Sequence, residues 1–100
     1  MKFSVASQYE AKIGPMENLK FRKSIHSKEH VSLRKFWKNK RKALGLSQRA
    51  FARKHNYDYS LISKIERGDR RLDSIETVQY CENLKVNPYE LIDIILESLN

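Results

Sequence analysis

The chain has 100 residues, a common length for one domain, and carries 20 Lys and Arg against 12 Asp and Glu, a formal net charge of +8. Its hydrophobic content of 40% excludes a wholly disordered chain, and its single cysteine excludes an intramolecular disulfide and a multi-cysteine zinc site. No apolar run approaches the roughly 20 residues that a membrane span needs. The positive charge indicates an acidic partner, either nucleic acid or an anionic membrane surface.

The positive charge is concentrated in the middle of the chain. Residues 33–71 hold thirteen basic and three acidic side chains, which gives them a net charge of +10. Residues 1–32 carry +3 and residues 72–100 carry −5. Because a surface without a charged partner usually mixes its signs, this distribution predicts that the middle segment meets phosphate groups.

Residues 1–28 show no sustained periodicity. We expect residues 1–30 to form a basic, poorly structured tail or arm, and residues 31–100 to form the folded domain. His26 and His30 have helical spacing, but no third ligand is identifiable, so no metal site is expected.

Two short helices are predicted next. Apolar residues on one side of residues 32–44 predict a first helix that Gly45 ends. Ser47 has the position of an N-cap for a second helix over residues 48–55.

A third and a fourth helix follow at once. Asp58 is the expected cap of a helix over residues 58–67, with Gly68 at its end. Asp73 and Glu76 have capping-box spacing at the start of the next helix. The predicted buried stripe of that helix consists of Ile75, Val78, Cys81 and Leu84.

The last helix is expected to begin after Asn87 as cap, with Pro88 in its first turn and Glu90 as the reciprocal cap. It is apolar over more than one face, which is typical either of a dimer surface or of a well-buried lid on a small domain. The candidate dimer residues are Leu91, Ile92, Ile95, Leu96 and Leu99.

Two segments carry a resemblance to a known family. Residues 43–52 (ALGLSQRAFA) and 61–68 (LISKIERG) resemble the lambda-repressor-like, or Cro and Xre, helix-turn-helix regulators, and the resemblance covers about residues 33–96. It implies a compact, all-α, five-helix domain that binds DNA without a cofactor. No catalytic motif accompanies it, so an enzyme is not expected.

The resemblance also implies roles for individual residues. Tyr59, Ser60 and Lys64 match base-reading positions at the start of the recognition helix, and Ser63 flanks the same surface. Arg41 and Glu66 match an ion pair between the first and third helices. The candidate phosphate-binding residues are Gln48, Arg49, Arg67, Arg70 and Arg71.

The sequence departs from the family pattern in the turn between the second and third helices. His55 stands where an aliphatic core residue is usual, Asn56 replaces the usual glycine, and Tyr57 is larger than the usual residue. We therefore expect a repacked turn, which changes the direction in which the Tyr59 side chain points.

The predicted function is a sequence-specific, double-stranded DNA-binding transcriptional regulator, a repressor, of bacterial or phage type. It is expected to work as a cytoplasmic, nucleoid-associated homodimer with residues 58–67 in the major groove and no membrane contact. The alternative is an antitoxin or a protein-bridging coactivator that uses the same fold and binds a protein partner through residues 1–30.

Overall fold

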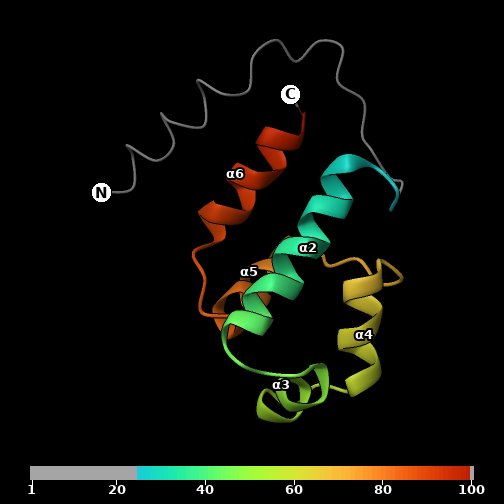
Figure 1. Cartoon of the computed structure of the whole chain (residues 1–100), viewed down its shortest axis with the longest axis vertical. Helices are drawn as coiled ribbons and strands as arrows, with labels where there is room; N and C mark the ends of the chain where they lie inside the picture. The colour runs from blue at the N-terminus through green and yellow to red at the C-terminus, as the bar shows by residue number, and fades with distance from the viewer. Residues whose placement is uncertain (1–24, 100) are drawn as a thin grey trace.

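The computed structural model describes residues 25–99, and within them the chain forms five helices and no strand (Figure 1). The helices are α2 (Lys28–Ala43), α3 (Gln48–Lys54), α4 (Tyr59–Arg67), α5 (Ser74–Asn83) and α6 (Pro88–Leu99). This confirms the predicted all-α, five-helix fold. Most of the expected tail, residues 1–24, lies outside the described residues.

The first helix, α2, begins at Lys28, before the predicted start near Ser32. Its N-cap is Ser27, whose Oγ accepts a hydrogen bond from the His30 N–H at 3.2 Å. Glu29 in the first turn suits the positive end of the helix dipole. The predicted start was wrong because the apolar pattern sets in about one turn after the cap, so α2 takes in the last residues assigned to the tail.

Side-chain caps start α3 and α5 where the sequence predicts them. The Ser47 Oγ accepts from the Ala50 N–H at 3.0 Å. Asp73 and Glu76 form a reciprocal capping box, with hydrogen bonds of 2.8 and 3.0 Å. Each cap satisfies backbone donors that a helix start leaves without a partner in the helix.

The starts of α4 and α6 match the expected caps only in part. Asp58 is the N-cap of α4, but its side chain accepts no hydrogen bond from the first turn of that helix. The Asn87 Oδ1 accepts from the Tyr89 N–H at 2.9 Å, as a cap does. Glu90 forms an ion pair with Lys40 of α2, with 3.0 Å between Nζ and Oε1, instead of capping α6.

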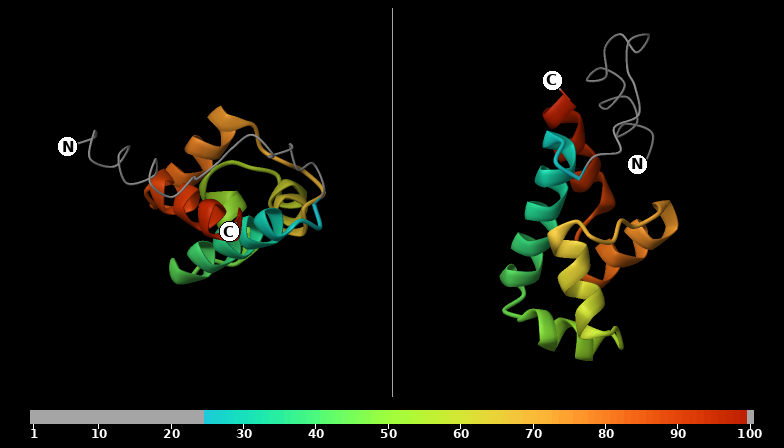
Figure 2. Two further views of the ribbon diagram at one scale, coloured as in Figure 1. Left: turned by 90° about the horizontal axis from the view of Figure 1, so that it is seen from above. Right: turned by 90° about the vertical axis from the view of Figure 1, so that its right-hand side faces the viewer.

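The core lies where α2 meets the other helices. α2 and α6 run side by side in opposite directions, and α4 packs against α2 (Figures 1 and 2). The largest fully buried side chains are Trp37, Phe51, Ile62, Cys81 and Leu84. The predicted core position of Cys81 is therefore confirmed, and burial raises the pKa of its thiol to about 11.

The predicted buried stripe of α5 is wrong in its first half. Ile75 is 72% exposed and Val78 is 47% exposed, whereas Tyr80, Cys81 and Leu84 are buried. Figure 2 shows the reason: α5 starts at the outer edge of the molecule and reaches the other helices only toward its end. Helical periodicity identifies a possible inner face, but the length of helix that other elements cover depends on packing.

Candidate nucleic-acid interface

The candidate interface is built on α3 and α4, which the turn of residues 55–58 joins. Asn56 takes a left-handed conformation there, with φ 61°, in place of the usual glycine. The Tyr57 N–H donates to the Ala52 carbonyl at 2.8 Å. The Tyr57 hydroxyl accepts from Asn83 Nδ2 of α5 at 2.6 Å, so the larger side chain has a partner on a neighbouring helix.

One face of α4 is exposed and the opposite face is buried. Ile62 and Ile65 are 0% and 3% exposed and anchor the helix to the core. Tyr59, Ser60 and Lys64 are exposed. Ser60 and Lys64 are four residues apart and therefore lie on one side of α4, and Tyr59 lies beside Ser60 in the first turn, so all three predicted base-reading side chains are on its accessible surface.

A buried polar cluster connects α2, α3 and α4. Arg41 Nε and Nη2 donate to the two Glu66 carboxylate oxygens at 2.7 and 3.0 Å, and Gln48 Nε2 donates to the same carboxylate at 3.0 Å. The third Arg41 donor, Nη1, bonds the Leu46 carbonyl at 2.7 Å. The paired side chains are only 6% and 4% exposed. Donating these hydrogen bonds to the Glu66 carboxylate raises the pKa of Arg41, and the contacts to Glu66 hold α4 against α2 and α3.

Arg49 stacks on a base-reading candidate. Its guanidinium carbon lies 4.2 Å from the centroid of the Tyr59 ring. The sequence predicts only a phosphate contact for Arg49, from its positive charge on the second helix. The stacking was not predicted, because the two residues are ten positions apart and meet only through the packing of α3 on α4.

The end of α4 holds Arg67 in local contacts. Arg67 Nη2 lies 3.0 Å from the Asp69 carboxylate, and Arg67 Nη1 donates to the Ser63 Oγ at 2.9 Å. Both charged side chains are more than half exposed, so this pair contributes little to stability. Ser63 therefore supports Arg67 in this structure and lies half-buried beside the exposed face of α4.

Arg70 and Arg71 follow α4 in the connection to α5. Arg70 forms a two-pronged ion pair with Glu76, with distances of 3.2 and 2.9 Å, and this interaction lowers the pKa of Glu76 to about 2. Arg71 is exposed. The capping box of α5 therefore partly neutralises Arg70, a contact that the sequence analysis missed although Glu76 was already recognised as a capping residue.

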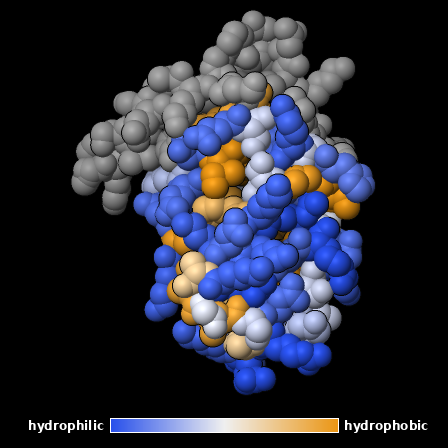
Figure 3. All heavy atoms as spheres, in the orientation of Figure 1, coloured by the Kyte–Doolittle hydropathy of each residue, from blue (hydrophilic) through white to orange (hydrophobic). Residues whose placement is uncertain are grey.

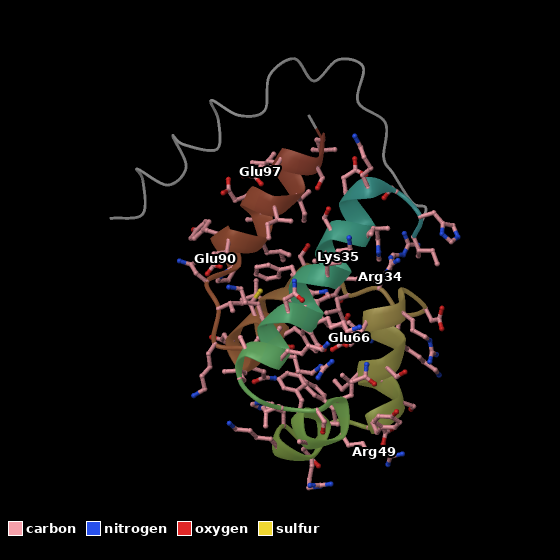
Figure 4. The ribbon with its side chains drawn as sticks, viewed as in Figure 1. Arg34, Lys35, Arg49, Glu66, Glu90 and Glu97 are labelled. Carbon is pink, nitrogen blue, oxygen red and sulfur yellow. The ribbon has the colours of Figure 1, made fainter. Side chains whose placement is uncertain are left out.

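Arg34 is a residue of this region that the sequence analysis missed. Its Nη1 donates to the Ile25 carbonyl at 2.7 Å and lies 2.8 Å from His30 Nδ1. Its guanidinium covers Gly68, where an added Cβ would lie 2.8 Å from Nη1. Figure 4 shows Arg34 beside the end of α4, Glu66 between α2 and α4, and Arg49 near the start of α4. Only the i, i+4 spacing from His30 could have suggested part of this arrangement.

A comparison with family models gives a match to residues 38–91, described as helix-turn-helix. The chain belongs to this helix-turn-helix family. The family is the lambda-repressor-like, Cro and Xre type that the residue runs resemble. Comparisons with curated proteins and with solved structures give no match. Family membership makes this chain a DNA-binding helix-turn-helix regulator.

The predicted dimer residues of α6, the C-terminal helix, differ in how far they are exposed. Leu91 is 3% exposed and packs in the core, so its assignment to a dimer surface is wrong. Ile92 is 40% exposed, and Ile95, Leu96 and Leu99 are half-buried. Figure 3 shows apolar side chains over α6 beside α2, while hydrophilic residues cover most of the same face around α4.

Residues 25–99 contain neither a candidate metal-binding cluster nor a helix that could cross a membrane. No group of three or more His, Cys, Asp and Glu side chains that could hold a metal ion occurs in residues 25–99. Within the same range, no helix combines the length and the apolar character that a membrane crossing requires.

Proposed function

We propose that the chain is a sequence-specific transcriptional repressor of bacterial or phage type that places α4 in the major groove of double-stranded DNA. The observation that carries this proposal is the exposed face of α4, where Tyr59, Ser60 and Lys64 lie together. In a helix-turn-helix protein, the N-terminal residues of the second helix reach base edges. Lys64 can donate to guanine O6 or N7, and Ser60 can donate or accept.

The cluster of the buried Arg41 and Glu66 side chains with the half-buried Gln48 supports this reading. It fixes α4 relative to α2 and α3 through three hydrogen bonds from Arg41 and Gln48 to Glu66, and a fourth from Arg41 holds the loop between α2 and α3. A recognition helix must keep its angle to its supporting helices, because a base contact tolerates little displacement. Gln48 acts mainly as a brace in this proposal, with a phosphate contact as its second role.

Phosphate contacts are assigned to Arg49, Arg67, Arg70 and Arg71, which lie on α3, at the end of α4 and in the segment after it. Arg67 and Arg70 exchange part of their ion pairing with Asp69 and Glu76 for DNA phosphates when they bind. Such contacts supply affinity and register without reading sequence. The protein acts on DNA in the cytoplasm, without a cofactor and without catalysis.

Homodimerisation through α6 is part of the proposal. Ile92 is 40% exposed at the surface of a helix that is apolar over more than one face. Two copies joined there would read half-sites about 34 Å apart. Sedimentation measurements on the full chain and on Ile92→Lys test this: we expect the variant to be monomeric and to bind a single half-site with near-normal affinity.

The experiment that tests the whole proposal is selection of bound sequences from a random DNA pool by the full chain at about 150 mM salt. We expect a consensus for the unmodified chain. Lys64→Ala is expected to relax the preference at one position and to cost about 1–3 kcal/mol. Arg71→Ala is expected to weaken all sites alike and to reduce the salt dependence by about one unit.

Failure to recover any consensus would contradict the repressor proposal. The alternative functions, antitoxin and protein-bridging coactivator, depend on a protein partner for residues 1–30, and residues 1–24 lie outside the described part of the chain. Deletion of residues 1–24 distinguishes them: it leaves specific DNA binding largely intact in a repressor and abolishes partner binding in an antitoxin or coactivator.

A further inference from the structure

We propose that Arg49 determines base specificity by stacking on Tyr59 and holding its ring for contact with a thymine methyl group. This inference rests on the proposed function, because it concerns how α4 would read a base. It assigns Arg49 a positioning role in addition to a phosphate contact.

The geometry of the two side chains supports a preformed stack. The Arg49 guanidinium carbon lies 4.2 Å from the Tyr59 ring centroid, well within the distance of about 6 Å for a cation–π contact. Arg49 is the second residue of α3 and Tyr59 is the first of α4. Phe51 and Ile62 of the same helices are both 0% exposed, so the two backbones are anchored in the core.

The stack restricts a side chain that would otherwise be free to rotate. Tyr59 is 42% exposed, and an exposed tyrosine near a helix start samples several staggered rotamers. Covering one face of the ring with a guanidinium favours the rotamer that keeps this contact. Ordering the ring before binding lowers the entropy cost of ordering it on DNA.

The accessible part of the Tyr59 ring is suited to contact with one chemical group in the major groove. The ring face opposite the guanidinium is largely apolar, because the only polar atom of the side chain, the hydroxyl oxygen, lies at the ring edge. In the major groove, the apolar group that distinguishes bases is the C5 methyl of thymine. The guanidinium keeps its in-plane N–H groups while it stacks, so Arg49 can bind a phosphate at the same time.

The two possible roles of Arg49, phosphate binding and stacking, predict different effects of replacing it by lysine. A role limited to phosphate attraction requires only a positive charge, which lysine also supplies. A stacking role requires the planar guanidinium, which lysine lacks. Arg49→Lys therefore separates the two roles, and Arg53→Lys, at an exposed position on the same helix, is the matched control.

The test uses sequence selection with the full chain and its variants. Tyr59→Leu and Arg49→Lys are expected to relax the preference for thymine at the same base pair, by about fourfold, the value of one buried methyl group. Tyr59→Phe keeps the ring and is expected to keep the preference. Arg53→Lys is expected to leave every position unchanged.

Two further measurements make the test specific. Replacing the contacted thymine by deoxyuridine removes only the methyl group, and it is expected to weaken the unmodified chain about fourfold and Tyr59→Leu by less, because the shorter leucine side chain makes a smaller contact. In NMR spectra of the free protein, the Arg49 side-chain methylene protons are expected to show an upfield ring-current shift that Tyr59→Leu abolishes.

The outcomes separate this inference from the function on which it rests. A consensus that Arg49→Lys leaves intact while Tyr59→Leu relaxes it would overturn the positioning role and preserve the repressor proposal. Absence of the ring-current shift in the folded protein would overturn the stack itself. Absence of any consensus for the unmodified chain would overturn the proposed function, and the inference with it.

Discussion

Arg41 of α2 and Glu66 of α4 form a two-pronged ion pair across 25 positions of sequence, with 2.7 Å between Nε and Oε2 and 3.0 Å between Nη2 and Oε1. Both side chains are almost completely buried. Removing one member leaves an uncompensated charge in the interior, and the cost of that exceeds what the intact pair contributes.

We expect Arg41→Met to lower the free energy of unfolding by about 3–5 kcal/mol. The double variant Arg41→Met/Glu66→Met is expected to be more stable than either single variant, because it leaves no charge unpaired. Urea unfolding followed by circular dichroism measures both. Strictly additive single and double effects would show that the two side chains do not interact.

Gly45 and Gly68 have a left-handed backbone conformation, and replacing them is expected to lower stability by different amounts. Gly45 has φ 75° with open space around it, so Gly45→Ala is expected to cost only the backbone strain, about 1 kcal/mol. Gly68→Ala is expected to cost more, because its Cβ would also displace the Arg34 guanidinium. Thermal unfolding measures the stability that each variant loses. Adding Arg34→Ala to Gly68→Ala is expected to reduce the extra loss at position 68, because no guanidinium is then displaced.

Lys85 also has a left-handed backbone conformation, and there a change to glycine is expected to raise stability. It has φ 60°, a conformation in which any residue with a Cβ is strained. Lys85→Gly is expected to raise the free energy of unfolding by about 0.5–1 kcal/mol after the added flexibility of the unfolded chain is included. Gln79→Gly, an exposed position inside α5, is the control and is expected to destabilise.

His55 is expected to make stability depend on pH. Burial, with Lys54 and Lys85 nearby, lowers its pKa below the ordinary value of 6.5. The unfolded chain therefore binds a proton more readily than the folded one, so stability is fully present above about pH 6.5 and falls as the pH drops below it. Its Nε2 is buried and has no hydrogen-bond partner among residues 25–99.

We therefore expect His55→Leu to be more stable than the unmodified chain at pH 5, with a smaller advantage at pH 7.5. His30 also has a lowered pKa, caused by burial, Arg34 and Arg71, so a slope of the same sign remains in the variant. Urea midpoints at several pH values measure the effect. An unchanged slope would show that His55 does not titrate with unfolding.

Glu76→Gln is expected to strengthen DNA binding. The change removes the charge that pairs with Arg70, while the amide can still cap α5. Arg70 then becomes available to a phosphate, so we expect the salt dependence of binding to steepen by up to about one unit. Glu82→Gln makes the same change of charge at another exposed position of α5, and an equal effect there would indicate net charge alone.

Many local features were correctly predicted from the sequence. The caps Ser47 and Asp73 begin their helices as expected, and Gly68 ends α4 in the left-handed conformation. These signals depend on atoms within four residues of one another, so they can be read without knowledge of the fold. The helix-turn-helix family follows from such runs, and the family match over residues 38–91 confirms it.

Other features depend on which helices meet. Ile75 and Val78 lie on the predicted inner face of α5 but are exposed, because that end of the helix extends beyond its neighbours. Arg34 covers Gly68, and Arg49 stacks on Tyr59, through packing between helices. No local pattern encodes these contacts.

By itself, the sequence determined the N-caps of α3 and α5, the end of α4, the family and the concentration of positive charge, because caps, periodicity and composition are local or additive properties. Only the tertiary structure decided which partner each of these basic side chains contacts. Arg41 is buried against Glu66, Arg70 is paired with Glu76 and Arg49 stacks on Tyr59. A net charge counts side chains, whereas electrostatic and stacking energies depend on the distances between them and on their burial.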